Sequence, residues 1–319
     1  MRAPPFSLHP GQTISDQPRF RALSLGAGVQ SSTLLALSAE GILPKVDYAI
    51  FADTGWEPAA VYAHLDRLEE EIAAPAGIPV LRVSAGNIRD DALNPGHRFA
   101  SMPLHILNQD GRPGMTRRQC TGEYKVKPIK QKARELLGYP YPARIPKGVF
   151  VEQWVGISTD EFHRAKDADV KYMRNRHPLL DMSWSRADCA RYLTSLGLAD
   201  TPKSSCSFFF HGNAQWRHIR DTSPSEWADV VEFDAAIRQG NARANATGNR
   251  LLGEAFLHRS RVPLSEAPID HVTAAERAAL RISADEADVL ENGVEDGCSP
   301  WACRGDADAL TQDDFGLAT

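Results

Sequence analysis

The sequence predicts an α/β fold: a mainly parallel sheet of about five strands, flanked by helices and followed by a helical C-terminal region. Three observations predict it. Short apolar runs alternate with helical stretches from residue 20 to about residue 200. The first apolar run passes through two glycines directly into a helix. From about residue 200 the pattern turns helical and irregular. Such alternation is typical of right-handed βαβ units, whose strands are parallel.

The predicted elements follow one another along the chain. We expect strands over residues 21–25, 46–51, 80–83, 149–157 and 177–182. We expect helices over residues 31–40, 59–72, 127–137 and 185–196. The last helix has a clear start, because Ser185 can cap it and Asp188 stands three residues later. Residues 86–118 contain scattered Gly, Pro, Asn and Arg, so we expect a long loop there.

Length and composition limit the class of protein. The 319 residues suffice for one large α/β domain or two domains. We divide the chain into a Pro-rich arm (1–19), a main domain (20–200) and a C-terminal region with an acidic tail (201–319). The net charge of −5 argues against nonspecific coating of nucleic acid but allows a local basic face.

The sequence also indicates the cellular compartment. Residues 1–17 lack the apolar segment of a secretion signal, and no apolar run is long enough to cross a membrane. Five cysteines in a chain of this length, without such a signal, favour a reducing compartment. We therefore expect a cytoplasmic protein that has no membrane partner.

Residues 23–33 read Leu-Ser-Leu-Gly-Ala-Gly-Val-Gln-Ser-Ser-Thr and are the most informative stretch. A strand that turns sharply into a helix presents backbone N–H groups and the positive end of the helix dipole, which together bind phosphate. The glycines allow an anion to approach closely, and the hydroxyls add donors. The sequence therefore predicts a site for a nucleotide or another phosphorylated ligand, formed by Ser24, Gly26, Ala27, Gly28, Gln30, Ser31, Ser32 and Thr33.

This turn is not specific by itself. It lacks the Gly-Lys-Ser/Thr of a Walker A loop, and Ser31 stands where a dinucleotide-binding turn has its third Gly or Ala. The alternative is an ordinary strand-to-helix turn made of small residues.

Four further segments follow the turn in order. They are Asp53-Thr54-Gly55-Trp56-Glu57-Pro58, Cys120-Thr121-x-x-x-Lys125-Val126-Lys127-Pro128-Ile129, Val155-Gly156-Ile157-Ser158-x-x-Glu161-x-x-Arg164, and Pro178-Leu179-Leu180-Asp181-Met182-Ser183. Together with the turn they resemble the motifs of the phosphoadenosine phosphosulfate reductase family, within the PP-loop (adenine nucleotide α-hydrolase-like) superfamily. The resemblance covers roughly residues 20–220.

The resemblance implies a Rossmann-like (HUP-type) nucleotide-binding domain over 20–200. It implies ATP or phosphoadenosine phosphosulfate as ligand, with Mg²⁺. By the same resemblance, the residues beside the nucleotide outside the first turn are Asp53, Thr54, Gly55, Gly156 and Arg164, and the catalytic residues are Cys120, Lys125, Arg118 and Glu161. Two alternatives stay open: Asp53 can cap the next helix, and Glu161 with Arg164 can form a surface ion pair.

The chain departs from the family at three points. Gln30 stands where the superfamily usually has Asp, and Ser158 replaces the usual Arg. The Glu-Cys-Gly-x-His string that carries the reductases' catalytic cysteine is absent from the sequence.

Residues 112–134 hold eight basic residues against the single acid Glu123. Arg117 and Arg118 can fork onto phosphate or sulfate, and Lys125 can neutralise a leaving pyrophosphate. For Lys130 and Lys132 we favour a solvated helix face.

The cysteines allow several interpretations. Cys189 lies inside a predicted helix and is expected in the core. Four thiolates, from Cys120, Cys206, Cys298 and Cys303, could hold a [4Fe–4S] cluster or a zinc ion, although no Cys-x-x-Cys is present. Alternatively the thiols are free, or Cys298 and Cys303 form a redox pair.

These observations lead to one favoured hypothesis and two alternatives. The favoured one is AMP-forming, ATP pyrophosphatase-type activation of a substrate for sulfur transfer, with a nucleic acid or a sulfur carrier as partner. The first alternative is a sulfonucleotide reductase that releases sulfite. The second is a nucleotide-binding regulator without turnover, which Gln30 in place of Asp suggests. A dinucleotide oxidoreductase is disfavoured because it leaves the later segments unexplained.

Overall fold

A computed structural model describes residues 17–97, 101–202, 207–246 and 251–273. Its centre is a parallel sheet of five strands in the order β3-β2-β1-β6-β7. The strands are β1 (Phe20–Ser24), β2 (Tyr48–Asp53), β3 (Val80–Ser84), β6 (Val151–Trp154) and β7 (Met173–Arg176). The predicted α/β fold class is confirmed.

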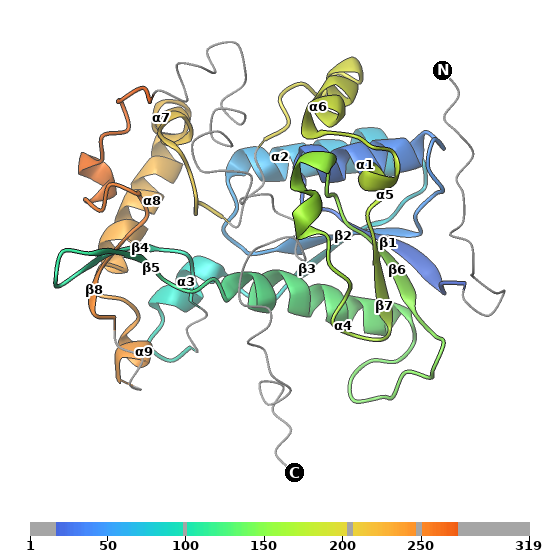
Figure 1. Cartoon of the computed structure of the whole chain (residues 1–319), viewed down its shortest axis with the longest axis horizontal. Coiled ribbons are helices and arrows are strands. Elements are labelled where there is room, and N and C mark those ends of the chain that lie inside the picture. Colours follow the sequence, from blue (N-terminus) through green and yellow to red (C-terminus); the bar gives the residue numbers. More distant parts are fainter. Residues whose placement is uncertain (1–16, 98–100, 203–206, 247–250, 274–319) are drawn as a thin grey trace.

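Helices cover both faces of this sheet (Figure 1). One face is packed by α1 (Val29–Ala39), α2 (Ala59–Leu68) and α6 (Arg186–Ser195), and the other by α4 (Lys127–Leu136). Successive strand residues point to opposite faces. Leu23 accordingly packs among the apolar residues of α1 and α2, whereas its neighbour Ala22 packs against Ile129 and Ala133 of α4. Both faces of the sheet are therefore buried, as the continuous apolar strands predicted.

A second, smaller layer lies beside the parallel sheet. An antiparallel sheet has the order β5-β4-β8, with β4 (His105–Asn108), β5 (Pro113–Met115) and β8 (Gly253–Phe256). It is accompanied by α3 (Ile88–Leu93), α7 (Asn213–Thr222), α8 (Pro224–Ala236) and α9 (Ala242–Ala246). Its core contains the ring of Trp56, whose centroid lies 4.9 Å from Phe208 and 4.6 Å from Phe233. The layer joins strands from distant parts of the chain, since β8 pairs with β4.

Two local predictions were wrong. The expected loop over residues 86–118 contains α3, β4 and β5. These strands are only three or four residues long, and β5 includes Pro and Gly, so they give no apolar alternation. The expected strand over residues 177–182 is the short helix α5 (Pro178–Asp181), which Pro178 begins. The strand lies just before it, as the polar edge strand β7.

The other elements match the expectations closely. Ser185 caps α6 in a capping box, with Ser185 Oγ accepting from Asp188 N at 3.2 Å and Asp188 Oδ2 accepting from Ser185 N at 2.8 Å. Short helical turns complete the fold: η2 (Glu69–Ala73), η3 (Gly122–Val126), η4 (Thr159–Arg164) and η5 (Leu264–Glu266). Within the described ranges, no helix combines the length and apolarity needed to span a bilayer.

Candidate functional site

The predicted segments meet at the carboxyl edge of the parallel sheet. The strands β1, β2, β3 and β6 end there at Ser24, Asp53, Ser84 and Trp154. The turn into α1, the Asp53–Pro58 segment and the Val155–Arg164 segment each follow one of these strand ends. η3, which carries Lys125, packs against β2. Ligands of open α/β sheets bind at this edge.

The turn between β1 and α1 is held by its own hydroxyl groups. Ser31 Oγ accepts from Gly26 N at 3.1 Å and donates to Gly28 O at 3.2 Å. Ser32 Oγ lies 3.1 Å from His64 Nε2, and Thr33 Oγ1 donates to Val29 O at 2.8 Å. These three hydroxyls, expected as phosphate donors, therefore shape the turn in this structure.

The donors left at the turn are backbone groups. The N–H groups of residues 28–31 donate no hydrogen bond to any part of the chain that the structure describes. Ser24 is 2 % exposed, and its Oγ has no partner among the described residues. Ala27 adopts a φ of 56°, which lets the chain bend sharply before α1 starts at Val29. A helix start with four N–H groups that have no described acceptor favours the binding of an anion.

Gly156 lies directly against this turn. A Cβ at position 156 would stand 3.0 Å from Ser31 N and 3.1 Å from both the carbonyl carbon and the Cβ of Gln30. Carbon atoms normally approach no closer than about 3.5 Å. Glycine is therefore the residue that allows the segment after β6 to support the start of α1.

Gln30 connects the turn to a buried ionic group. Its Nε2 donates to Glu161 Oε1 at 3.3 Å, and its Oε1 accepts from Arg186 Nη1 at 3.0 Å. Arg164 Nη1 donates to the other Glu161 oxygen at 2.9 Å. Glu161 and Arg164 thus form the ion pair of the open alternative, but they are 3 % and 2 % exposed, so its expected surface location is wrong. Burial raises the pKa of Glu161, and the guanidinium groups of Arg164 and Arg186 oppose that shift.

Asp53 shapes the turn that follows β2. Its Oδ1 accepts from Gly55 N at 2.8 Å and from the Tyr62 hydroxyl at 2.7 Å. Helix α2 is preceded by Pro58, so Asp53 does not cap it and that alternative is also wrong. Gly55 has a φ of +72°, and a Cβ there would lie 2.9 Å from Asn87 Cα, so the turn requires glycine.

A buried ion pair joins this turn to η3. Lys125 Nζ lies 3.3 Å from Glu57 Oε1, and the two side chains are 5 % and 1 % exposed. Glu57 also accepts from Thr54 Oγ1 at 3.0 Å and from Ser207 N at 3.2 Å. Lys125 was predicted from the resemblance, whereas Glu57 and Ser207 were not. The available signal for Glu57 was an acidic residue shortly after Asp-Thr-Gly.

Arg186 was also missed, because an arginine at the start of a helix has no distinctive sequence signal. Arg118, in contrast, was predicted, and its guanidinium carbon lies 4.7 Å from the centroid of the Phe210 ring. Segment 207–210, which contacts Glu57 through Ser207 and Arg118 through Phe210, is thus part of the site's surroundings.

The cysteines are placed only in part. Cys120 is 1 % exposed and packs in the same apolar cluster as Trp56 and Phe208. Cys189 is fully buried, as expected of a core residue, and burial raises the pKa of its thiol to about 12. Cys206, Cys298 and Cys303 lie outside the described residues. Within those residues, no group of three His, Cys, Asp or Glu side chains is arranged to hold a metal.

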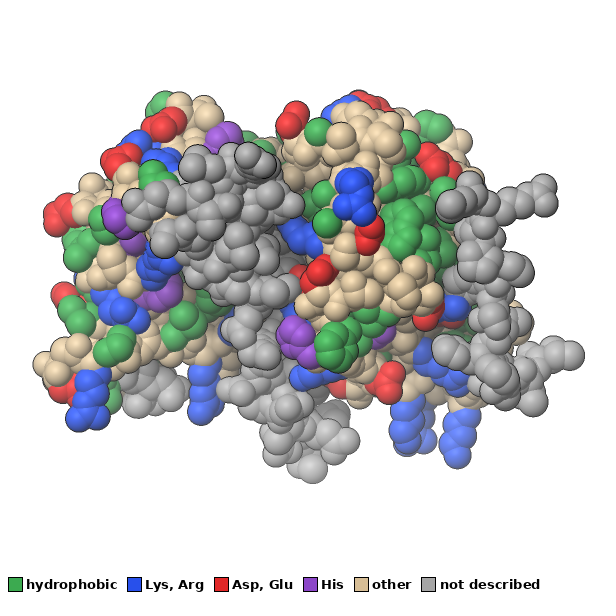
Figure 2. Space-filling view, turned by 45° about the horizontal axis from the view of Figure 1, so that its top comes forward, with side chains coloured by type: hydrophobic (Ala, Val, Ile, Leu, Met, Phe, Trp, Pro, Cys, Tyr) green, Lys and Arg blue, Asp and Glu red, His purple; other side chains and the backbone are tan. Residues whose placement is uncertain are grey.

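The basic residues of segment 112–134 form more ion pairs than the sequence indicated. Lys130 Nζ lies 2.6 Å from Asp169 and is 8 % exposed, so its expected place on a solvated face is wrong. Lys132 pairs with Glu135, Lys127 with Glu123 and Arg112 with Asp110. Figure 2 shows Lys and Arg side chains projecting along the lower rim of the molecule, interspersed with carboxylates. Each of these four basic residues therefore has a carboxylate partner.

Comparison with known proteins shows no matching family model and no matching curated protein. The resemblance therefore depends on the five segments themselves, and the structure supports its coarsest part, a parallel five-stranded α/β sheet.

Proposed function

We propose that this chain binds ATP at the carboxyl edge of its parallel sheet and adenylates a second substrate, releasing pyrophosphate, in preparation for sulfur transfer. The observation that carries the proposal is the start of α1. Four N–H groups there have no partner among the described residues, beside the buried Ser24 hydroxyl. These donors suit a polyphosphate.

The reaction is a displacement at the α-phosphorus. An oxygen of the second substrate forms a bond to that phosphorus, and the bond to the bridging oxygen of the β-phosphate breaks. Pyrophosphate leaves with the electron pair. The N–H groups of residues 28–31 hold the phosphate oxygens in line. Lys125, fixed by Glu57, supplies positive charge toward the leaving pyrophosphate.

Mg²⁺ would enter with the nucleotide, since it is usually held by substrate phosphates and one or two carboxylates. Asp53 fits this role, because it lies at the sheet edge and has no cationic partner within the described part of the chain. Glu57 and Glu161 fit it less well, because each already contacts a cation. When bound, the ion supplies neutralising charge to the phosphates. A cluster is not proposed, because Cys120 is the only one of its four expected ligands that the structure describes, and it is buried among apolar residues.

The test is release of pyrophosphate from ATP by the full chain, together with ATP binding by calorimetry. Ser31→Ala removes the hydroxyl that bridges Gly26 and Gly28, so we expect weaker ATP binding. Ser195→Ala is the control, because that exposed hydroxyl on α6 bonds only its own helix.

Three outcomes would change the conclusion. Sulfite release from phosphoadenosine phosphosulfate with thioredoxin would favour a reductase. Tight ATP binding without product would favour a regulator. Failure of ATP to bind at all would refute the site.

A further inference from the structure

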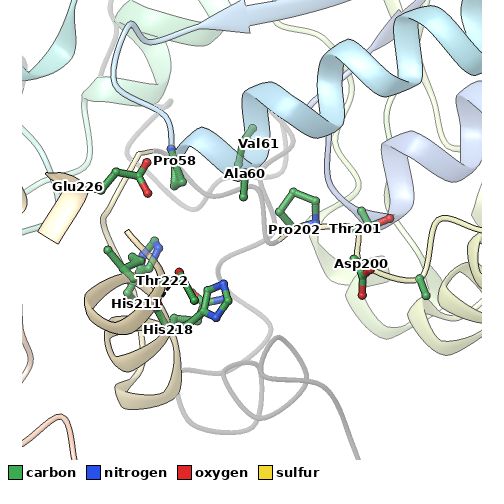
Figure 3. A pocket seen from close by; sticks show the side chains of 13 residues that line it. Pro58, Ala60, Val61, Asp200, Thr201, Pro202, His211, His218, Thr222 and Glu226 are labelled. Atoms are coloured by element: carbon green, nitrogen blue, oxygen red, sulfur yellow. Dashed lines mark hydrogen bonds between the residues drawn. The ribbon is translucent and has the colours of Figure 1, made fainter. Parts of the chain in front are cut away.

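A cavity of about 300 Å³ lies beside the site. Its walls come from the first turn of α2, residues 199–202 after α6, and the α7 and α8 helices. Figure 3 shows the side chains of His211 and His218 on one wall, facing Ala60 and Val61 on α2. Its size is at the lower end of the range for small-molecule sites. The cavity adjoins Pro58, the residue after Glu57, and so shares the β2–α2 turn with the candidate nucleotide site.

The Asp and Glu side chains of the described lining make the cavity acidic. Two carboxylates, Asp200 and Glu226, line the cavity on opposite sides, and its described lining contains no Lys or Arg. His211 and His218 add ring nitrogens. The nucleotide turn has the opposite character, with backbone donors and Arg186 beside it. The two carboxylates of the described lining therefore favour a cationic ligand over a phosphate or a carboxylate.

The start of α2 does not reverse this conclusion. A helix start normally favours an anion. Here Glu226 Oε1 already accepts from Ala59 N at 2.6 Å, so the chain's own carboxylate occupies that position. The second oxygen of Glu226 is not used in that hydrogen bond. The lining also includes the apolar side chains of Pro58, Val61 and Ile219.

We propose that this cavity binds a small organic amine. The ammonium group lies against the carboxylate of Glu226, where a charge-assisted hydrogen bond forms. The carbon skeleton lies along Pro58, Val61 and Ile219, where it is removed from water. Binding of the amine requires no nucleotide, so this proposal and the proposed function fail separately.

The experiment measures binding of paired probes to the full chain by calorimetry and ligand-observed NMR. The probes are butylamine with butyrate, and benzylamine with benzoate, because each pair shares a carbon skeleton and differs in charge. We expect saturable binding of at least one amine and none of its carboxylate. ATP binding is measured on the same samples.

Two variants with matched controls locate the amine. Ala60→Trp fills the cavity from an exposed position of α2, and Ala63→Trp places the same ring on the same helix outside the cavity. We expect the first to abolish amine binding and the second to leave it unchanged. Glu226→Gln keeps an acceptor for Ala59 N but removes the charge, so we expect about tenfold weaker binding. Glu232→Gln, on the same helix, is its control.

Several results would overturn the proposal. They are absence of saturable binding of both amines, carboxylates that bind as tightly as amines, or an Ala60→Trp variant that folds and still binds the amine. Displacement of the amine by ATP would show that the cavity is the end of the nucleotide's own site, which also refutes a separate amine site.

Discussion

Gly156→Ala tests how the nucleotide turn is held. The added Cβ would lie 3.0 Å from Ser31 N and 3.1 Å from two atoms of Gln30. Two of these three atoms belong to the backbone and cannot rotate away. To reach ordinary contact, the start of α1 and the segment after β6 must separate by roughly 0.5 Å. Overpacking of this kind costs about 1–3 kcal/mol.

For a domain of this size each kcal/mol lowers the melting temperature by about 2–4 °C. Differential scanning calorimetry measures the loss, and calorimetric titration measures ATP binding. We expect both to fall, because the displaced atoms belong to the turn that presents the N–H groups. Gly114→Ala is the control, since its Cβ would meet only the end of the Asn108 side chain, at 3.2 Å, and Ile106 Cβ at an ordinary 3.6 Å. Wild-type melting and wild-type ATP affinity in Gly156→Ala would refute the packing argument.

Three further predictions concern buried titratable side chains. Lys125→Met removes the cation that lies 3.3 Å from the buried Glu57 carboxylate and should lower the free energy of unfolding by about 3–5 kcal/mol in urea titrations, whereas Lys132→Met, at a half-exposed pair, should change it little. Adding Glu57→Leu to Lys125→Met should restore part of that loss, because no buried charge is left alone; a double variant less stable than Lys125→Met would contradict this. Burial lowers the pKa of His64 from 6.5 to about 4, so the folded state favours neutral His64; this contribution to stability is complete above about pH 6.5 and is lost as the pH falls toward 4. Between pH 7 and pH 5 the free energy of unfolding should therefore fall less in His64→Gln than in the wild type. An equal fall in both proteins would show that His64 does not titrate in that way.

Local sequence signals predicted the central elements well. The apolar runs of β1, β2 and β6 were recognisable because these strands lie inside the sheet and are largely buried, and β3, although an edge strand, still carries the apolar residues Val80, Leu81 and Val83. The α6 start was recognisable because Ser185 and Asp188 bond each other within one turn. Strand β7 was missed because a polar edge strand has no such pattern. Strands β4 and β8 were missed because they pair with each other from distant parts of the chain, and β5 was missed because it is three residues long and contains Pro and Gly.

The candidate site was likewise predicted only in part. Gly55 and Gly156 were named from the family resemblance, whereas the backbone reason for each glycine, a positive φ at Gly55 and a close approach at Gly156, came only from the structure. The hydrogen bond between Gln30 and Glu161 and the ion pair between Glu57 and Lys125 were not predicted, because the partners are distant in sequence.

By itself, the sequence determined the parallel α/β fold class and the position of the sharp turn before the first helix. Both follow from properties of short stretches of the chain, namely the apolarity of the strand segments and the backbone freedom of small residues. Only the tertiary structure decided which side chains are neutralised, which hydroxyls are used inside the protein, and where an acidic cavity lies. The physical reason is that burial and ion pairing depend on distance in space, and folding brings together residues that are far apart in the sequence, such as Glu57 and Lys125.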